Sequence, residues 1–355
     1  MLSMNPGPLG ALGIVYPEHG RMGTAHHNVA KWLKKMPGDA DPRQDELGKA
    51  LCAELANTPR AILSSEEFHT LTSRGVKLLS KLLSGHDVKV YLYVRDHLRY
   101  MASWYQQSIQ STHLSLSFDK FCDYAHAPFM AVADRWAASF GQDNVVLRLY
   151  DRAALRNKDV VSDLLYEALG IDDLKGFERK PRDSNPSLSG NLLFFKRIIN
   201  NFLPKAEAGG QLANECTALA SLDPTFSGSI LVDDAVAKFV NNLYAGDRAK
   251  LDKKYGIVFP PTKSSGVPVP DLGRLTDDWK LITQHARLKD FKVAQYFDLI
   301  ESFDPSMLAA ASATAIKPAT GGDDGDRLAR LEQEFKAMRS RQDDLETRLT
   351  KLAGP

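Results

Sequence analysis

One segment, VKVYLYVRDHLRYMASWYQQSIQ (88–110), constrains the fold more than any other part of the chain. Its first part, 88–94, is rich in Val, Tyr and Leu, which is typical of a buried strand. Apolar residues then recur at the spacing of one helix face: Leu98, Met101, Ala102, Tyr105 and Ile109. A strand that leads directly into an amphipathic helix is the repeating unit of an α/β fold.

Two other short apolar segments fit the same scheme, RAILSS (60–65) and NVVLRLY (144–150). Helical patterns accompany them at 67–83 and 128–141. Strands that alternate with helices favour a parallel sheet, because each crossover returns the chain to the same end of the sheet. We therefore predict an α/β domain with a mostly parallel sheet flanked by helices.

The strand signal fades after about residue 185, and three helical patterns follow, at 189–203, 233–256 and 276–303, the last as one broken helix or two. Residues 304–326 are rich in Ala, Gly and Asp, which predicts a flexible linker. The expected organisation is one domain over 1–303, with a mostly helical part at 185–303 on the acceptor side, a linker at 304–326, and a separate helix at 327–353.

That last helix has an apolar seam in which steps of three and four residues alternate. The seam residues are Leu328, Leu331, Phe335, Met338, Gln342, Leu345, Leu349 and Leu352. Such alternation is typical of a coiled coil, so we expect homo-oligomers formed through 327–353. The alternative is a single amphipathic helix docked on the body of the protein.

Charge and composition exclude several classes of partner and site. The chain has 45 basic and 44 acidic residues, a net charge of +1, so neither nucleic acid nor an anionic membrane is expected to bind. No apolar run is long enough for membrane insertion. Three cysteines without CxxC spacing predict reduced thiols and a cytoplasmic protein. Nine histidines without metal-ligand spacing predict no metal site.

Arg95 stands where the strand at 88–94 ends and the helix begins. Ligands of open parallel sheets bind beyond the carboxyl ends of the strands, and helix starts attract anions. A guanidinium there favours a phosphate, and Ser103, eight residues later, offers a hydroxyl to the same group. The alternative is that Arg95 pairs with a carboxylate and Ser103 is only a small helical residue.

The segment YVRDHLRYMASWYQQS resembles the 3′-phosphate-binding segment of sulfotransferases that use 3′-phosphoadenosine-5′-phosphosulfate (PAPS). In that family a strand-terminal Arg and a Ser eight residues later hold the 3′-phosphate, and Arg95 and Ser103 match those positions. The resemblance covers about 8–260 and includes AILSSEEF (61–68), ALGID (168–172) and NPSLS (185–189). It implies a P-loop NTPase-like sulfotransferase fold with PAPS as co-substrate.

The resemblance also implies roles for other residues. Tyr150, in NVVLRLYDRAAL, falls where the family's Tyr contacts the adenine; it is equally well explained as a cap of the sheet edge. Glu66 falls where the family places its general base, although it also suits the start of a helix as a simple charge. His26 and His27 are the competing base candidates, and adjacent histidines on a loop are often only surface or capping residues.

One element of that family is missing from the sequence. The first strand and the KxGTT-type loop, whose lysine and backbone N–H groups hold the 5′-phosphosulfate, have no counterpart here. We expect either a natural protein that starts further upstream or a derivative that has lost the chemistry. This chain should then bind a 3′-phosphonucleotide weakly and transfer sulfate poorly.

The leading hypothesis is a sulfotransferase-like enzyme that moves a sulfuryl group from PAPS to a hydroxyl or amine of a small-molecule, carbohydrate or lipid acceptor. The alternative is a non-catalytic, oligomeric interaction protein built on the same fold. A P-loop kinase or hydrolase fits less well, because no GxxxxGK[ST] loop occurs in the sequence.

Overall fold

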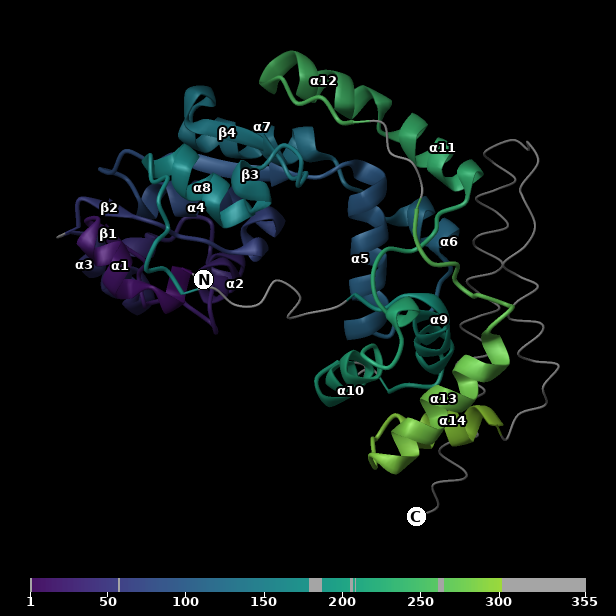
Figure 1. Cartoon of the computed structure of the whole chain (residues 1–355). Helices are drawn as coiled ribbons and strands as arrows, with labels where there is room; N and C mark the ends of the chain where they lie inside the picture. The colour runs from purple at the N-terminus through teal and green to yellow at the C-terminus, as the bar shows by residue number, and fades with distance from the viewer. Residues whose placement is uncertain are drawn as a thin grey trace. The chain divides into compact units, whose positions relative to one another are not determined.

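The computed structural model describes residues 2–56, 58–178, 187–204, 207, 209–260 and 265–301. These residues form two compact units (Figure 1). The first unit comprises the described residues of Met1–Asp96, Ala127–Ser184 and Leu243–Pro261. The second comprises those of His97–His126, Asn185–Asn242 and Thr262–Pro355. Strands and helices occur together in the first unit, so the predicted α/β class is confirmed at that level.

The first unit contains all four named strands among the described residues, together with the helices that cover them. Its elements are η1 (Leu2–Met4), α1 (Pro6–Ala11), β1 (Ile14–Val15), α2 (His27–Lys35), η2 (Pro42–Gln44), α3 (Glu46–Ala56), β2 (Arg60–Ala61), η3 (Glu66–Thr70), α4 (Ser73–Leu82), β3 (Val90–Val94), α7 (Phe129–Phe140), η4 (Gln142–Asn144), β4 (Val145–Leu149), η5 (Arg156–Lys158), α8 (Val160–Leu169) and α12 (Ala245–Tyr255).

The strands pair in parallel, as predicted, but they do so in two separate pairs. β1 pairs with β2, with Ile14 opposite Arg60, and β3 pairs with β4, with Val94 opposite Leu149. Among the described residues no ladder joins the two pairs into one sheet. β3 and β4 lie within the predicted segments, whereas β2 is much shorter than 60–65, and β1 was not predicted.

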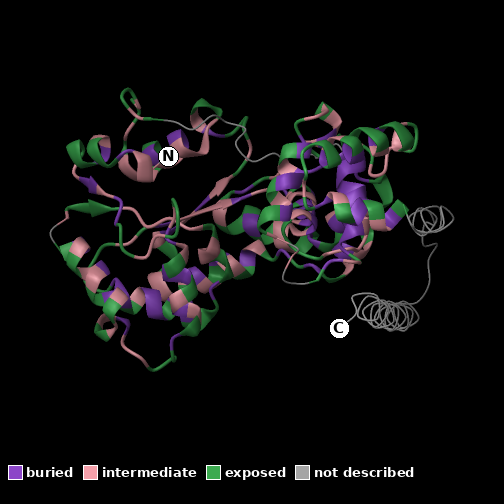
Figure 2. Ribbon diagram, turned by 90° about the horizontal axis from the view of Figure 1, so that it is seen from below, coloured by how far each residue is buried: buried purple, intermediate pink, exposed green. Residues whose placement is uncertain are grey.

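The core of the first unit lies between β3–β4 and helices α2, α4 and α7. Leu33 of α2, Val76 of α4 and Ala133 of α7 are fully buried there, and Figure 2 shows the buried residues inside the unit. The helix predicted at 67–83 is divided into η3 and α4. The helical pattern is interrupted at Thr72, whose side chain accepts a hydrogen bond from Gly75 N (3.4 Å) and so caps the start of α4.

The described part of the second unit has no named strand and consists of helices. They are α5 (His97–Ser111), α6 (Phe118–Tyr124), α9 (Gly190–Ile199), α10 (Gln211–Leu219), η7 (Pro224–Phe226), α11 (Asp234–Leu243, whose last residue falls in the first unit), α13 (Leu275–Leu288) and α14 (Ala294–Glu301). On α5, four of the five predicted apolar residues, Leu98, Met101, Tyr105 and Ile109, are buried, and Ala102 is half-buried. The segment predicted as one broken helix or two, 276–303, contains α13 and α14 in its described part. The helix predicted at 233–256 is divided at Tyr244 into α11 and α12.

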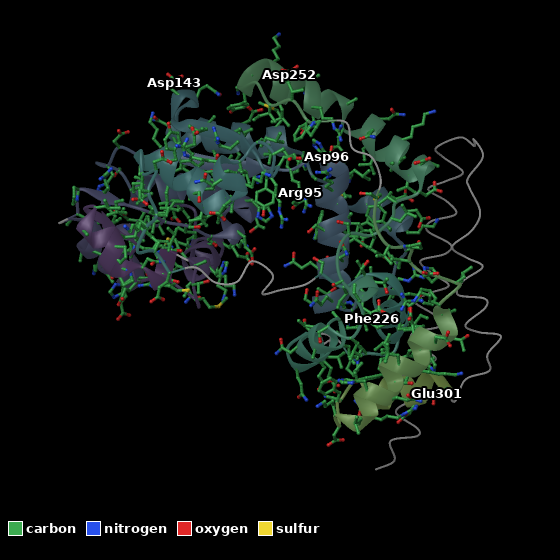
Figure 3. The ribbon with its side chains drawn as sticks, viewed as in Figure 1. Arg95, Asp96, Asp143, Phe226, Asp252 and Glu301 are labelled. Carbon is green, nitrogen blue, oxygen red and sulfur yellow. The ribbon has the colours of Figure 1, made fainter. Side chains whose placement is uncertain are left out.

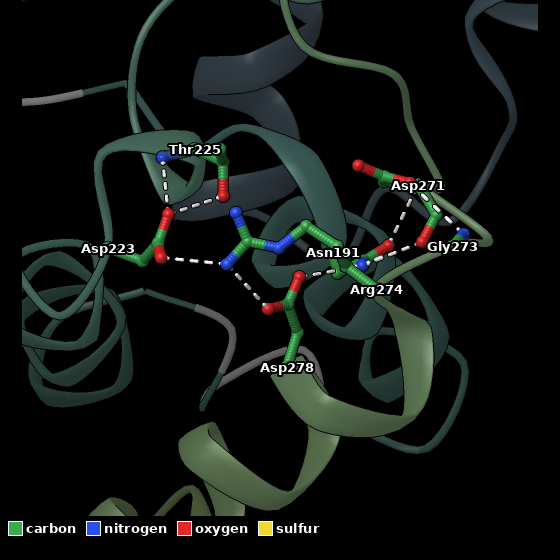
Figure 4. Close-up of polar contacts among 7 residues, drawn as sticks. All are labelled: Asn191, Asp223, Thr225, Asp271, Gly273, Arg274 and Asp278. Atoms are coloured by element: carbon green, nitrogen blue, oxygen red, sulfur yellow. Dashed lines mark hydrogen bonds and ion pairs between the residues drawn. The ribbon is translucent and has the colours of Figure 1, made fainter.

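A polar cluster holds part of the second unit together (Figure 4). Arg274 donates to Asp223 Oδ2 (2.7 Å) and to Asp278 Oδ1 (3.1 Å). Asn191 donates to the other oxygen of Asp278 (2.8 Å) and to the carbonyl of Asp271 (2.9 Å). These bonds join the start of α9, the turn before η7 and the start of α13, and they satisfy the buried carboxylate of Asp278.

The linker predicted at 304–326 and the coiled coil predicted at 327–353 lie outside the described residues. Within the described part, no helix is long and apolar enough to cross a membrane. All three cysteines are described and carry free thiols; Cys122 and Cys216 are buried and Cys52 is half-buried.

Candidate functional site

The carboxyl ends of β3 and β4 bring two of the predicted nucleotide-binding residues to one edge. The strands run in register up to Val94 and Leu149, and Tyr150 N donates to Val94 O (2.7 Å) one step further on. Arg95 and Tyr150 are therefore the residues that come directly after the last pair, Val94 and Leu149. Tyr150 is 43% exposed, so part of this residue is accessible to a ligand.

Arg95 is half-buried and stands at the end of β3, next to Asp96 (Figure 3). Ser103 is also half-buried, on α5. Arg95 belongs to the first unit and Ser103 to the second. Their joint binding of one phosphate stays a prediction.

Asp96 is a further residue at this edge, to which no role in the site was assigned from the sequence. Its side chain is 4% exposed, and Arg248 Nη2 of α12 donates to its Oδ2 (2.8 Å). A buried carboxylate requires such a partner because its desolvation is costly. The only sequence signal was an acidic residue after a strand, whereas Arg248 lies 152 residues away with no local pattern to connect them.

Arg248 also borders a shallow pocket of about 210 Å³ in the first unit. The pocket is lined by Arg248, Ala249, Asp252, Ile257, Val258 and Phe259. The guanidinium of Arg248 lies over the ring of Phe259, 5.5 Å from its centroid, a cation–π contact that restrains the side chain. Val258 is 65% exposed, so the pocket opens to solvent on that side.

His26 lies beyond the ends of β1 and β2, and its ring is completely buried. Its Nδ1 accepts from Ser64 N (3.2 Å), and its Nε2 donates to the carbonyl of Pro17 (2.9 Å). The ring packs edge-on against Tyr16, with centroids 4.6 Å apart. Burial lowers the pKa of His26, which keeps the ring neutral. Both nitrogens are occupied by the backbone, so His26 joins two loops and has no nitrogen left for a substrate proton.

His27 has a different environment, although it is the next residue. It is half-buried at the first position of α2, and its Nδ1 is 2.9 Å from Ser65 Oγ. Ser65 Oγ also accepts from Glu67 N (3.1 Å), which leaves its hydroxyl hydrogen free to point to Nδ1. Nδ1 can accept that hydrogen or, in the other tautomer, donate its own ring hydrogen to Oγ, and either hydrogen bond fixes the orientation of the ring.

The carboxylate of Glu66 is exposed at the start of η3. Its neighbour Glu67 instead pairs with Lys34 (2.7 Å), and this hydrogen bond lowers the pKa of Glu67. The structure thus places all three base candidates near the ends of β1 and β2, with Ser65 linking His27 to the segment that carries Glu66. Among the described residues, no group of three or more His, Cys, Asp or Glu side chains is arranged to hold a metal ion.

Comparison with known proteins gives one relative and no family. No family model matches the chain, and no solved structure matches it. A protein of Archaeoglobus fulgidus named as uncharacterized is 30% identical over 142 residues, which are 40% of this chain and 38% of that protein. The chain thus covers well under half of this relative, whose name assigns no activity.

Proposed function

We propose that this chain is a sulfotransferase-like protein that binds PAPS and moves its sulfuryl group to a hydroxyl or amine acceptor. The observation that carries the proposal is the hydrogen bond between Tyr150 N and Val94 O, which puts Tyr150 and Arg95 side by side at the end of β3–β4. In the proposal, Arg95 binds the 3′-phosphate and Tyr150 stacks on the adenine. Ser103 is the predicted second ligand of the phosphate.

We propose His27 as the base among the three candidates. His26 uses both ring nitrogens on backbone groups, and Glu66 is exposed at the start of η3. His27 is oriented by Ser65 and is half-buried. For the proton of the acceptor to be taken up by Nε2, the Nδ1 of His27 must carry the ring hydrogen and donate it to Ser65 Oγ, so the proposal requires this tautomer during catalysis.

The division of the sheet is compatible with the proposal. The resemblance implies a central strand that carries the lysine loop, and the described residues contain no ladder between β1–β2 and β3–β4. The printed sequence contains no KxGTT-type loop. The proposal therefore names residues of this chain for three tasks only: contact with the adenine, binding of the 3′-phosphate and uptake of the proton from the acceptor group.

Calorimetric titration with 3′-phosphoadenosine-5′-phosphate tests the nucleotide site. We expect binding by the unmutated chain and a loss of about 10- to 100-fold in affinity for Arg95→Ala, the size of one or two charge-assisted hydrogen bonds. Arg60→Ala is the control, because Arg60 is an exposed arginine in the other strand pair, at the first position of β2. Its affinity should equal that of the unmutated chain.

If the unmutated chain gives no heat of binding, the nucleotide proposal is wrong. The second candidate, a non-catalytic interaction protein, then remains, and the heptad seam at 328–352 is the feature of the sequence that favours it.

A further inference from the structure

A row of aromatic side chains crosses helices α5 and α6, which lie side by side in the second unit (Figure 1). Trp104 of α5 meets Phe121 of α6 edge-on, with ring centroids 5.2 Å apart and planes at 82°. Phe121 meets Tyr124, three residues further along α6, at 5.6 Å and 76°. Tyr100, four residues before Trp104 on α5, extends the row with centroids 6.0 Å apart. We call these four residues the aromatic row.

A buried aromatic core holds the row in place from behind. Phe121 is 2% exposed and Tyr105 is 1% exposed, with their ring centroids 5.5 Å apart. Phe118 packs on Tyr105 with centroids 5.3 Å apart. Tyr105 also donates from its hydroxyl to the carbonyl of Leu116 (2.9 Å). Because this packing and the hydrogen bond restrain the rings, the row is already formed before a ligand binds, which lowers the entropy cost of binding.

The outer rings of the row are accessible and carry polar groups at their edges. Tyr124 is 47% exposed, and Trp104 is half-buried. Within the described part of the chain, neither the indole N–H of Trp104 nor the hydroxyl of Tyr124 has a hydrogen-bond partner. Burial raises the pKa of Tyr124, so its hydroxyl keeps its proton near neutral pH and can donate. Aromatic rings with a polar group at the edge are typical of binding surfaces.

Carbohydrate is the class of ligand that uses both properties of the row. The C–H groups on one face of a pyranose ring pack on an aromatic ring, and the sugar hydroxyls need hydrogen-bond partners beside it. A nucleotide also stacks on aromatic rings, but Asp119, an exposed acidic residue of α6, repels its phosphates. A lipid chain would leave the indole N–H and the tyrosine hydroxyl without hydrogen-bond partners, which is unfavourable.

We propose that the aromatic row is a carbohydrate-binding site, in which a pyranose ring stacks on Trp104 and sugar hydroxyls bond to Trp104 Nε1 and Tyr124 Oη. Together with the proposed function, which this step rests on, the site names the acceptor as a carbohydrate. In that transfer the S–O bond to the nucleotide breaks, 3′-phosphoadenosine-5′-phosphate leaves, a new S–O bond forms to the sugar hydroxyl, and the hydroxyl proton passes to the base.

Binding is tested with two neutral oligosaccharides of β-linked pyranose rings, cellohexaose and chitohexaose. The indole N–H resonance of Trp104, assigned with Trp104→Phe, should shift and saturate with at least one of them. The resonance of Trp279 is the internal control, because its N–H donates to Glu301 (3.1 Å) and should not move. If neither oligosaccharide gives a saturable shift of the Trp104 resonance, the proposal is wrong.

Calorimetric titration of variants with the oligosaccharide that binds measures what the row contributes. We expect Trp104→Phe, which removes the N–H and shortens the ring, to lower the affinity about 3- to 10-fold. Tyr124→Ala, which removes a ring and a hydroxyl, should lower it about tenfold. The control is Tyr166→Ala, on α8 of the first unit, because Tyr166 is 39% exposed and lies outside the row. Its affinity should be unchanged.

Unchanged affinity in both row variants, or an equal loss in Tyr166→Ala, would overturn the proposal. If Trp104→Phe does not fold, Tyr124→Ala decides, because almost half of Tyr124 is exposed and its removal disturbs the core less. Phosphatidylcholine vesicles that shift the Trp104 resonance when neither oligosaccharide does would assign the row to a lipid and would also overturn the proposal.

The oligosaccharide titrations contain no nucleotide, so the two proposals fail separately. If 3′-phosphoadenosine-5′-phosphate does not bind but an oligosaccharide does, the proposed function is wrong and the carbohydrate site is supported. If the nucleotide binds and neither oligosaccharide does, the nucleotide site is supported and the carbohydrate site is wrong.

Discussion

Lys196 shows what burial does to a single charged residue. Its side chain is 1% exposed on α9, and its Nζ donates to the carbonyl of Ile109 (3.1 Å) and to Asn200 Oδ1. Asn200 also donates to Ile109 O (2.9 Å), so both side chains provide hydrogen bonds to a backbone carbonyl in the last turn of α5. Both acceptors of Lys196 are neutral, and burial lowers the pKa of the ammonium group to about 8.

The stability of the fold should therefore depend on pH through Lys196. The pKa of lysine in the unfolded chain is near 10.5, so between about pH 8 and pH 10.5 the unfolded chain binds the additional proton. The contribution of Lys196 to the free energy of unfolding should then rise with pH across this window. Urea denaturation gives the free energy of unfolding of the unmutated chain and of Lys196→Met. The difference between these two free energies should change with pH. A difference that is constant from about pH 7 to about pH 10 would contradict the role assigned to Lys196.

The two adjacent histidines should respond differently to truncation. His26→Ala removes a buried ring with two backbone hydrogen bonds, and we expect a loss of about 2–4 kcal/mol in the free energy of unfolding. His27→Ala removes a half-buried ring with one side-chain hydrogen bond and should cost within about 1 kcal/mol. Chemical denaturation of both variants checks this order, and equal losses would refute the structural assignment of His26.

At the scale of elements, long apolar segments were predictable and short pairings were not. β3, β4 and α5 follow directly from runs of Val, Leu and Tyr or from helical spacing, because burial of one face determines them. β1 consists only of Ile14 and Val15, so its strand character depends on pairing with β2 and not on a local pattern. Likewise, Thr72 divides a continuous helical pattern by capping, which periodicity alone does not reveal.

Packing of α3 against η2 depends on a glycine. A Cβ at Gly48 would lie 1.7 Å from the carbonyl oxygen of Pro42, so α3 would have to move away from that turn. We expect Gly48→Ala to lower the free energy of unfolding by about 2 kcal/mol or more, despite the better helix propensity of alanine. In the matched control Gly246→Ala, on α12, the added methyl meets nothing within 4 Å and should be neutral or stabilising by up to ~1 kcal/mol. Thermal unfolding of both variants measures the effect; similar melting temperatures would contradict the contact.

At the scale of the whole molecule, sequence reasoning predicted the class and the helical later part but not the division of the chain. The second unit takes in 97–126 as well as most of 185–303. Contacts such as Ala127 with Tyr244 and Asp96 with Arg248 join segments more than a hundred residues apart. No local pattern reports such pairs, which is also why Arg248 was missed, whereas Arg95 was proposed from its place at a strand end and Tyr150 from the family resemblance.

Burial also separates the three thiols of the chain. Burial raises the pKa of Cys122 to about 12 and that of Cys216 to about 11, so both are protonated near neutral pH. Cys52 is only half-buried. An aromatic disulfide reagent should therefore modify Cys52 in the native protein well before the other two, which should react only on unfolding. Native modification of Cys122 or Cys216 at the same rate would contradict the burial of these thiols.

The most direct test of the central claim is a crystal structure of the chain with 3′-phosphoadenosine-5′-phosphate. The account predicts the adenine against the ring of Tyr150 and the 3′-phosphate on the guanidinium of Arg95, at the carboxyl ends of β3 and β4. A nucleotide bound elsewhere, or bound there with Arg95 turned away from its phosphate, would contradict it.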